Sequence, residues 1–335
     1  MYRIKAKDLV NSDEFVREPV DKEVNDILAS KDKRFIITGG TGIGKSTVLR
    51  SIENRGIGSN KLTIYQCPEG ISYMGIEPGE KYSKESFDTF YELYFTRRIL
   101  WYIEKNYPLT FKKHFEEDKA LVEHLTDEVY DALNGVEYII ANGYVKFKTN
   151  VSVGELSTNI IRKIRDVLEL EELNITIDRF DQMNNCSKCV QEIYTNYFDL
   201  FDKTIIVSDD PNLNKEELTS KGYNIKQISY GKDKEVVREI IKRRIDQVRR
   251  ENVYKEDKNK QEVPQKIFMS DEFLDRIVDL DGNINMILDA MYDANNSLGW
   301  SDKTPFDQIL INTKKKLNEQ EKSYKKIKQP TILYL

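Results

Sequence analysis

Residues 34–50 read RFIITGGTGIGKSTVLR, and this stretch decides the fold. A short apolar run rich in β-branched residues ends in glycines, which is typical of a buried strand followed by a tight loop. From Lys45 onward the apolar residues return at helical spacing. A strand, a glycine-rich loop and a helix in this order predict a loop that holds phosphate groups.

The loop fits the pattern G-x-x-x-x-G-K-[ST], with Gly39, Gly44, Lys45 and Ser46 at the fixed positions. Glycines let the backbone wrap closely round a phosphate, and the following helix adds its positive N-terminal end. Lys45 is expected to reach the β- and γ-phosphates of a nucleotide, and the Ser46 hydroxyl to ligate Mg²⁺. The predicted nucleotide-binding residues are Gly39, Gly40, Thr41, Gly42, Ile43, Gly44, Lys45, Ser46 and Thr47.

A phosphate loop of this kind also needs an acid on a neighbouring strand to hold the metal ion. Residues 173–178, LNITID, read as a buried strand that ends in Asp178, which is the best candidate. Many such enzymes place a glutamate directly after this acid to orient the attacking water, but here that position is Arg179. Either Asp181 orients the water, or hydrolysis is slow and the protein behaves as a switch.

Further strands and helices alternate along the chain. Strands are expected at residues 61–67, 203–208 and near NIKQIS, and a helix from about Ser187 to Phe201. This alternation predicts an α/β fold, a parallel sheet with helices on both faces, followed by an all-helical part. The expected divisions are an α/β core over 1–230 with a helical insertion at about 106–152, a helical region over 231–300 and a lysine-rich tail over 301–335.

One aromatic stripe falls inside the core. Phe87, Phe90, Tyr91 and Tyr94 share one helical face, and such a stripe is far more often core than a ligand surface.

Composition bounds the class of protein. Hydrophobic residues make up 39% of the chain and charged residues 33%, which is typical of a globular protein. No apolar run approaches the roughly 18 residues that cross a membrane, and the first residues lack the apolar core of a signal peptide, so a cytoplasmic location is expected. The net charge of −5 gives no global argument for nucleic-acid binding, although the tail is rich in lysine. That tail is either a solvated helix face or a surface that contacts phosphates.

The three cysteines give little support for a metal or redox site. Cys186 and Cys189 form the spacing CSKC, and only Cys67, His114 and His124 could complete a four-ligand zinc site. Since none of these three has a motif spacing relative to the pair, we expect reduced thiols.

The motifs together resemble those of the AAA+ and STAND-like ATPases, with the origin-recognition and KAP-type branches nearest. Residues 15–28 resemble the box that precedes the phosphate loop and packs near the adenine, and GGTGIGKSTVL is similar to the STAND-type loop. ITIDRFDQM is similar to the D-x-x-D form of the metal-binding strand. IIVSDD resembles the first sensor strand, which would place Ser208 or Asp209 near the γ-phosphate and leave Asp210 just beyond.

The resemblance extends over residues 15–298 and implies a helical lid from Asp233. Asn285 stands where the family carries a second sensor arginine, which favours a switch over a continuous motor. Arg243 and Arg244, and more weakly Arg97 and Arg98, are either fingers towards a neighbouring subunit or structural ion-pair partners. The resemblance also implies ATP and Mg²⁺ as cofactors. Adenine is expected rather than guanine, because no N-K-x-D motif for guanine is present. The candidate catalytic residues are Lys45, Asp178, Asp181, Ser208 and Asp209.

Two uses of ATP remain open. One is a nucleotide-driven switch for a separately encoded effector protein, plausibly in bacterial antiphage defence or stress signalling, acting as a homo-oligomer or with that partner and without a membrane. The other is a nucleic-acid-remodelling ATPase such as a helicase loader, an initiator or a transposition regulator. A small-molecule kinase and an inactive scaffold are further alternatives, the first disfavoured by the long helical region and the second by the intact Lys45, Ser46 and Asp178.

Overall fold

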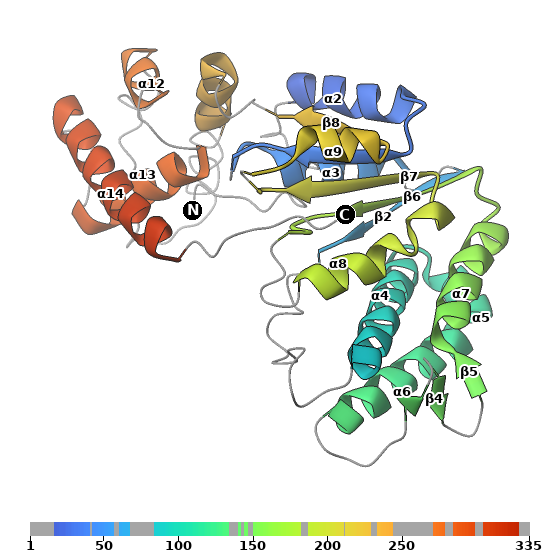
Figure 1. Cartoon of the computed structure of the whole chain (residues 1–335). Helices are drawn as coiled ribbons and strands as arrows, with labels where there is room; N and C mark the ends of the chain where they lie inside the picture. Colours follow the sequence, from blue (N-terminus) through green and yellow to red (C-terminus); the bar gives the residue numbers. More distant parts are fainter. Residues whose placement is uncertain are drawn as a thin grey trace. The chain divides into compact units, whose positions relative to one another are not determined.

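The structure is a computed structural model that describes residues 17–40, 42–56, 60–67, 84–133, 140–141, 144–146, 150–181, 187–210, 212–228, 233–243, 271–278, 284–298 and 304–327 (Figure 1). These residues fall into two compact units, which are taken in turn. The first unit holds the described residues of 1–29, 39–51 and 227–330. The second holds the described residues of 30–38 and 52–226.

The second unit is built on a five-stranded sheet in the order β2-β6-β7-β1-β8. Its strands are β1 (Arg34–Thr38), β2 (Lys61–Gln66), β6 (Glu172–Ile177), β7 (Lys203–Ser208) and β8 (Tyr223–Gln227). The pairs β1–β7, β6–β7 and β2–β6 are parallel. Each residue of β7 is buried, as expected for an inner strand covered on both faces. The predicted α/β fold with a parallel sheet is confirmed.

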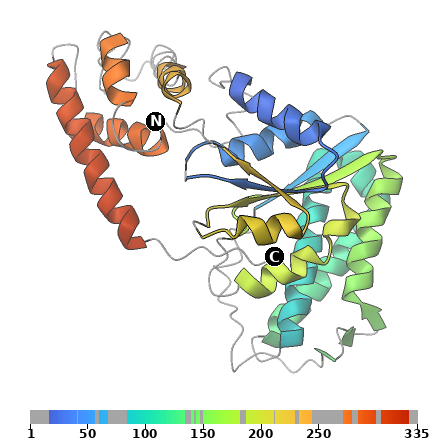
Figure 2. The ribbon, with the colours of Figure 1, turned by 45° about the horizontal axis from the view of Figure 1, so that its top comes forward.

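One face of this sheet carries a large helical layer. Its elements are α4 (Lys84–Asn106), α7 (Val153–Val167), α8 (Ser187–Thr195), the 3-10 helix η3 (Phe198–Leu200) and α9 (Lys215–Ser220). Figures 1 and 2 both show α4, α7 and α8 on the same side of the sheet. Their apolar residues form one cluster with the strands, in which Phe90, Tyr91 and Tyr94 are buried. The predicted aromatic core is therefore confirmed for these three residues, and the side chain of Phe87 lies outside the described residues.

The helix predicted to run from Ser187 to Phe201 is shorter than expected. It ends at Thr195, and the backbone N–H groups of Asn196 and Tyr197 bond three residues back, to Ile193 and Tyr194. Bonds of this length tighten the last turn and interrupt the α-helix before η3 begins.

The region between α4 and α7, where the sequence predicted a helical insertion, contains helices and also a small three-stranded sheet. The helices are α5 (Pro108–His114) and α6 (Glu116–Leu133). The short strands β3 (Ile140–Ala141), β4 (Tyr144–Lys146) and β5 (Asn150–Ser152) pair antiparallel. The Ser152 hydroxyl then caps α7 by accepting from the Glu155 N–H.

Apart from the loop over residues 39–44 and the end of β8, the described residues of the first unit are mainly helical. It contains α2 (Arg17–Ala29), the start of α3 (Lys45–Gly56), a helix over residues 234–243, α12 (Asp271–Val278), α13 (Ile284–Leu298) and α14 (Phe306–Ile327). Helices α13 and α14 pack on each other, and Ile309, Thr313 and Leu317 form the buried face of α14. Lys314 and Lys315 are exposed on the other side of α14. Between residues 306 and 319, where its side chains are described, the lysine-rich tail is an amphipathic helix.

Candidate nucleotide-binding site

The loop over residues 39–44 has the backbone that its glycines predict. Gly39, Gly42 and Gly44 have φ angles of 146°, 80° and 104°, which L side chains rarely adopt. A Cβ on Gly39 would lie 2.1 Å from Ile43 Cδ1 and 2.7 Å from the Ile228 carbonyl oxygen. A Cβ on Gly40 would meet only Ile43 Cγ2, at 3.8 Å. Position 39 thus requires a glycine because of its neighbours as well as its φ angle, whereas position 40 has neither requirement.

Lys45 opens α3 and its side chain turns back over the loop. Its ammonium group donates to the carbonyl oxygens of Gly39 and Gly40, each at 2.8 Å, and the residue is only 6% exposed. The Val48 N–H bonds to the Gly44 carbonyl and closes a turn of the helix at the loop. A helix N-terminus beside a glycine loop and a buried lysine is an arrangement that binds anions.

The remaining predicted loop residues lie as follows. Ile43 is buried, and Ser46 and Thr47 are half-buried in the first turn of α3. Thr41 lies outside the described residues.

The strand order locates a ligand-binding edge independently of this motif. After β1 the chain passes to β2 at the far edge of the sheet, whereas after β7 it passes to β8 on the other side of β1. The connections of two adjacent strands therefore leave in opposite directions, and ligands of open α/β sheets bind outside the carboxyl ends of strands at such a point. Here those ends are Thr38 and Ser208, which are paired in the register. The loop of residues 39–44 follows Thr38 directly.

Asp178 follows β6 at the same edge of the sheet. Its N–H donates to the Gln66 carbonyl at 2.9 Å, which continues the β2–β6 ladder by one residue. Its carboxylate accepts a hydrogen bond of 2.8 Å from the Tyr65 hydroxyl, and the residue is 4% exposed. The predicted metal-binding acid is therefore a buried carboxylate held in place by one hydroxyl.

Asp181 links the turn after β6 to the end of β7. Its Oδ2 accepts a 2.7 Å bond from the Ser208 hydroxyl and a second bond from the Asp209 N–H. The Ser208 hydroxyl in turn accepts from the Asp210 N–H at 3.1 Å. The structure thus brings together three of the residues that the sequence singled out separately, Asp181, Ser208 and Asp209.

The second oxygen of Asp181 has no such partner. No donor among the described residues bonds to Oδ1, although the residue is only 2% exposed. Burial raises the pKa of the Asp181 carboxyl to about 6, and the neighbouring Asp209 carboxylate acts in the same direction against the opposing Ser208 hydrogen bond. A buried carboxylate oxygen with a pKa near neutrality is suited to accept a proton or to orient a water molecule.

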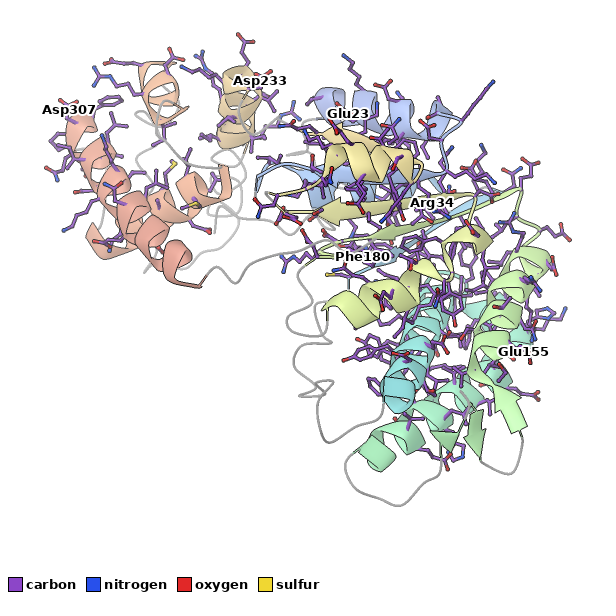
Figure 3. The ribbon with its side chains drawn as sticks, viewed as in Figure 1. Glu23, Arg34, Glu155, Phe180, Asp233 and Asp307 are labelled. Carbon is purple, nitrogen blue, oxygen red and sulfur yellow. The ribbon has the colours of Figure 1, made fainter. Side chains whose placement is uncertain are left out.

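Phe180 fixes the spacing of these two acids, and the sequence reasoning did not identify it. Its N–H bonds to the Val207 carbonyl at 3.3 Å, and its fully buried ring lies 6.1 Å from that of Tyr194 and 6.0 Å from that of Phe198. Figure 3 labels Phe180. The preceding Arg179 has a φ of 52°, so the chain turns sharply between Asp178 and Phe180. The apolar residue between the two acids of DRFD was the available signal.

Each unit by itself carries groups that suit part of a nucleoside triphosphate with Mg²⁺. In the first unit a Cβ would fill the cradle at Gly39, and the loop ends at a helix N-terminus with Lys45. In the second unit two buried carboxylates follow β6. Oxygen ligands are those that Mg²⁺ prefers, and one or two carboxylates with substrate phosphates are its usual protein environment.

The candidate arginines make structural contacts where they are described. Arg97 lies within 3.8 Å of Glu123 and 3.5 Å of Asp127 and stacks on Trp101. Arg98 donates to the Cys67 carbonyl, and Arg243 pairs with Glu239 one helical turn away at 2.6 Å. Arg244 and the side chain of Asn285 lie outside the described residues, so the predictions for a second arginine and for the missing sensor stay predictions.

No group of three or more histidine, cysteine, aspartate or glutamate side chains within the described ranges could hold a metal ion by itself. Cys67 follows β2, His114 ends α5 and His124 pairs with Glu128 on α6. Cys186 and the side chain of Cys189 lie outside the described residues.

Within the part of the chain that the structure describes, no helix combines the length and apolar character of a membrane span.

Comparison with known proteins gives distant structural matches. No family model matches the chain, and no curated protein matches it. Among solved structures, PCH-2 from C. elegans matches with 13% identity and a TM-score of 0.38 over 92% of this chain and 67% of its own. AMPPCP-bound DnaA from Aquifex aeolicus matches with the same identity and TM-score over 92% of this chain and 65% of its own. The chain thus spans about two thirds of the length of each.

Proposed function

We propose that this chain is an AAA+/STAND-like ATPase that binds Mg·ATP at residues 39–47 and hydrolyses it slowly. The observation that carries the proposal is the loop itself. Three glycines with positive φ lead into a helix whose first residue is a buried lysine folded over the loop carbonyls. Backbone amides, a helix N-terminus and an ammonium group together suit the phosphates of a nucleotide.

The roles of the individual residues follow from their positions. Lys45 would bind the β- and γ-phosphates, and the Ser46 hydroxyl and the Asp178 carboxylate would hold Mg²⁺. When bound, Mg²⁺ supplies neutralisation of the charge that develops on the phosphate oxygens. Asp181 would orient the attacking water and accept its proton at Oδ1, since Oδ2 is engaged by Ser208 and Asp209.

We further propose that the ATP state acts as a switch for a protein partner rather than driving a continuous motor. Asp181 joins the turn after β6 to the end of β7, so a change at its carboxylate reaches Ser208, Asp209 and Asp210. Arg179, which has a left-handed backbone conformation, occupies the position where many P-loop ATPases carry a catalytic glutamate. A homo-oligomer or a separately encoded effector protein would respond to this change, in bacterial antiphage defence or stress signalling in the cytoplasm.

The test is steady-state Mg·ATP hydrolysis and nucleotide binding by the purified chain. Lys45→Ala should abolish binding, because it removes the only ammonium group that the described loop carries. Asp181→Ala should keep binding and lower the hydrolysis rate about 100-fold or more, the usual contribution of a positioned base. Normal hydrolysis by Asp181→Ala would contradict the role given to Asp181, and unchanged binding by Lys45→Ala would contradict the ATP site.

A second candidate function is remodelling of nucleic acid. The observation that favours it is the outer face of α14, where Lys314 and Lys315 are exposed beside Ile311, which is 61% exposed. Lysines on one helix face can contact successive phosphates. In this case DNA would accelerate hydrolysis.

A further inference from the structure

The acid that we assign to Mg²⁺ is held by a residue from a different strand. Tyr65 lies on β2, and its hydroxyl donates to Asp178 Oδ2 at 2.8 Å. No motif in the sequence singled out Tyr65, because it stands 113 residues before Asp178.

The register of the sheet explains why these two side chains meet. Tyr65 pairs with Thr176, and side chains alternate along a strand, so Thr176 and Asp178 share a face with Tyr65. Asp178 is thus the diagonal neighbour of Tyr65, a separation that an aromatic side chain can bridge. The bond from the Asp178 N–H to the Gln66 carbonyl holds this register where β6 ends.

The environment makes the contact a rigid one. Asn174 and Thr176 on β6 and Asp178 directly after it are at most 4% exposed, and they alternate with the apolar Leu173 and Ile175 of the opposite face. Tyr65 is half-buried and packs against the apolar cluster. A carboxylate in such a place has few rotamers, and a hydroxyl donor selects one of them.

We propose that Tyr65 is a positioning residue for Mg²⁺ at the ATP site. By engaging Oδ2 it fixes the orientation of the carboxylate and directs Oδ1 to the cation, as hydrogen-bond donors behind metal ligands do in other metal sites. This inference rests on the proposed function, because it assumes that Asp178 holds Mg²⁺.

The test compares two tyrosines that each donate one hydrogen bond near β2. Tyr65→Phe removes the bond to Asp178, and Tyr102→Phe removes a 2.9 Å bond to the Thr63 carbonyl on the same strand. Binding of a fluorescent ATP analogue is titrated with Mg²⁺ for each variant and for wild type, and again in EDTA. Thermal unfolding in EDTA checks that each variant is folded.

For Tyr65→Phe, the Mg²⁺ concentration that gives half of the Mg²⁺-dependent binding should rise about 10-fold, the usual effect of losing a partner of a metal ligand. Binding in EDTA, which does not involve the metal, should stay near wild type. Tyr102→Phe should leave the Mg²⁺ titration unchanged, because its bond is remote from Asp178.

Three results would overturn the proposal. An unchanged or tighter Mg²⁺ response in Tyr65→Phe, or an equal loss in both variants, would show that Tyr65 does not position the metal ligand. In either case a wild-type response to Mg²⁺ leaves the proposed function standing. A wild-type chain that binds ATP equally with and without Mg²⁺ would instead remove the Mg²⁺ site itself, and the role of Tyr65 with it.

Discussion

At the scale of single residues, Gly39 and Gly40 show that two adjacent glycines of one loop can be under different structural constraints. The two glycines are adjacent, and both carbonyls accept from Lys45. Only Gly39 combines a positive φ with neighbours that a Cβ would strike. The motif alone gives both positions the same residue type, and the structure gives them different reasons for it.

Gly39→Ala should therefore abolish ATP binding and destabilise the chain by about 1–3 kcal/mol, because a strained backbone is forced to shift. Gly40→Ala, whose added methyl meets only Ile43 Cγ2 at 3.8 Å, should bind ATP with near-normal affinity. Nucleotide titration and thermal unfolding of the two variants measure both effects. Equal behaviour of the pair would mean that the contacts of Gly39 do not constrain the loop.

The raised pKa of Asp181 should make the stability of the folded chain depend on pH. Its pKa is raised from 3.8 to about 6 in the folded chain, so the folded state binds the proton more tightly than the unfolded state does. Stability from this group is then greatest at low pH and falls as the pH rises from about 4 to about 6, in total by about 3 kcal/mol. Asp181→Asn cannot titrate and should lack this loss.

Urea unfolding of wild type and of Asp181→Asn at several pH values between 4 and 7 measures this difference. The free energy of unfolding of the variant minus that of wild type should increase as the pH rises, and this difference should become constant above the pKa of Asp181 in the folded chain. Parallel curves for the two proteins would show that Asp181 titrates normally.

At the scale of the element, α14 shows how one helix divides its residues between two environments. Ile309 is fully buried and Ile311, two positions later, is 61% exposed. The same residue type thus faces the packing against α13 at one position and the solvent at the other.

Ile309→Ala should cost about 2–5 kcal/mol, because it leaves a cavity in the packed face of the helix. Ile311→Ala should change stability by less than about 0.5 kcal/mol. Denaturant unfolding of the two variants tests the orientation of α14. Similar losses would indicate that the exposed face of α14 is covered in solution.

At the scale of the whole molecule, the lysine-rich tail distinguishes the two proposed functions. The chain carries a net charge of −5, so DNA binding would depend on local clusters of lysine such as Lys314 and Lys315. If DNA stimulates hydrolysis, replacing both lysines by alanine should reduce the stimulation. The slope of log K for DNA binding against log salt concentration should also become shallower, by the amount expected for about two phosphate contacts. The matched control replaces Lys112 and Lys113, an adjacent exposed pair on α5. A hydrolysis rate that DNA leaves unchanged would favour the protein switch.

Some features of the fold and of the candidate site are predictable from the sequence, and others are not. The loop, Lys45 and Asp178 were predicted because their signals are local, namely a glycine pattern and an acid at the end of an apolar run. The parallel sheet followed from the alternation of strands and helices. The strand order and the pairing of Tyr65 with Thr176 join distant parts of the chain, and no local pattern encodes them. Phe180 has a local signal, its place between the two acids of DRFD, but the aromatic partners that hold its ring lie in a later segment.

The strand order has a consequence for hydrogen exchange. β6, β7 and β1 are the inner strands, whereas β2 and β8 form the edges. Local opening of a sheet begins where fewest hydrogen bonds must break, so amide protons of the edge strands should exchange with solvent first. The strands that lead to Asp178, Ser208 and the phosphate loop would then keep their protons until the sheet itself opens. A sheet built in this way can open locally at its edges while the strand ends that carry the proposed site stay in register.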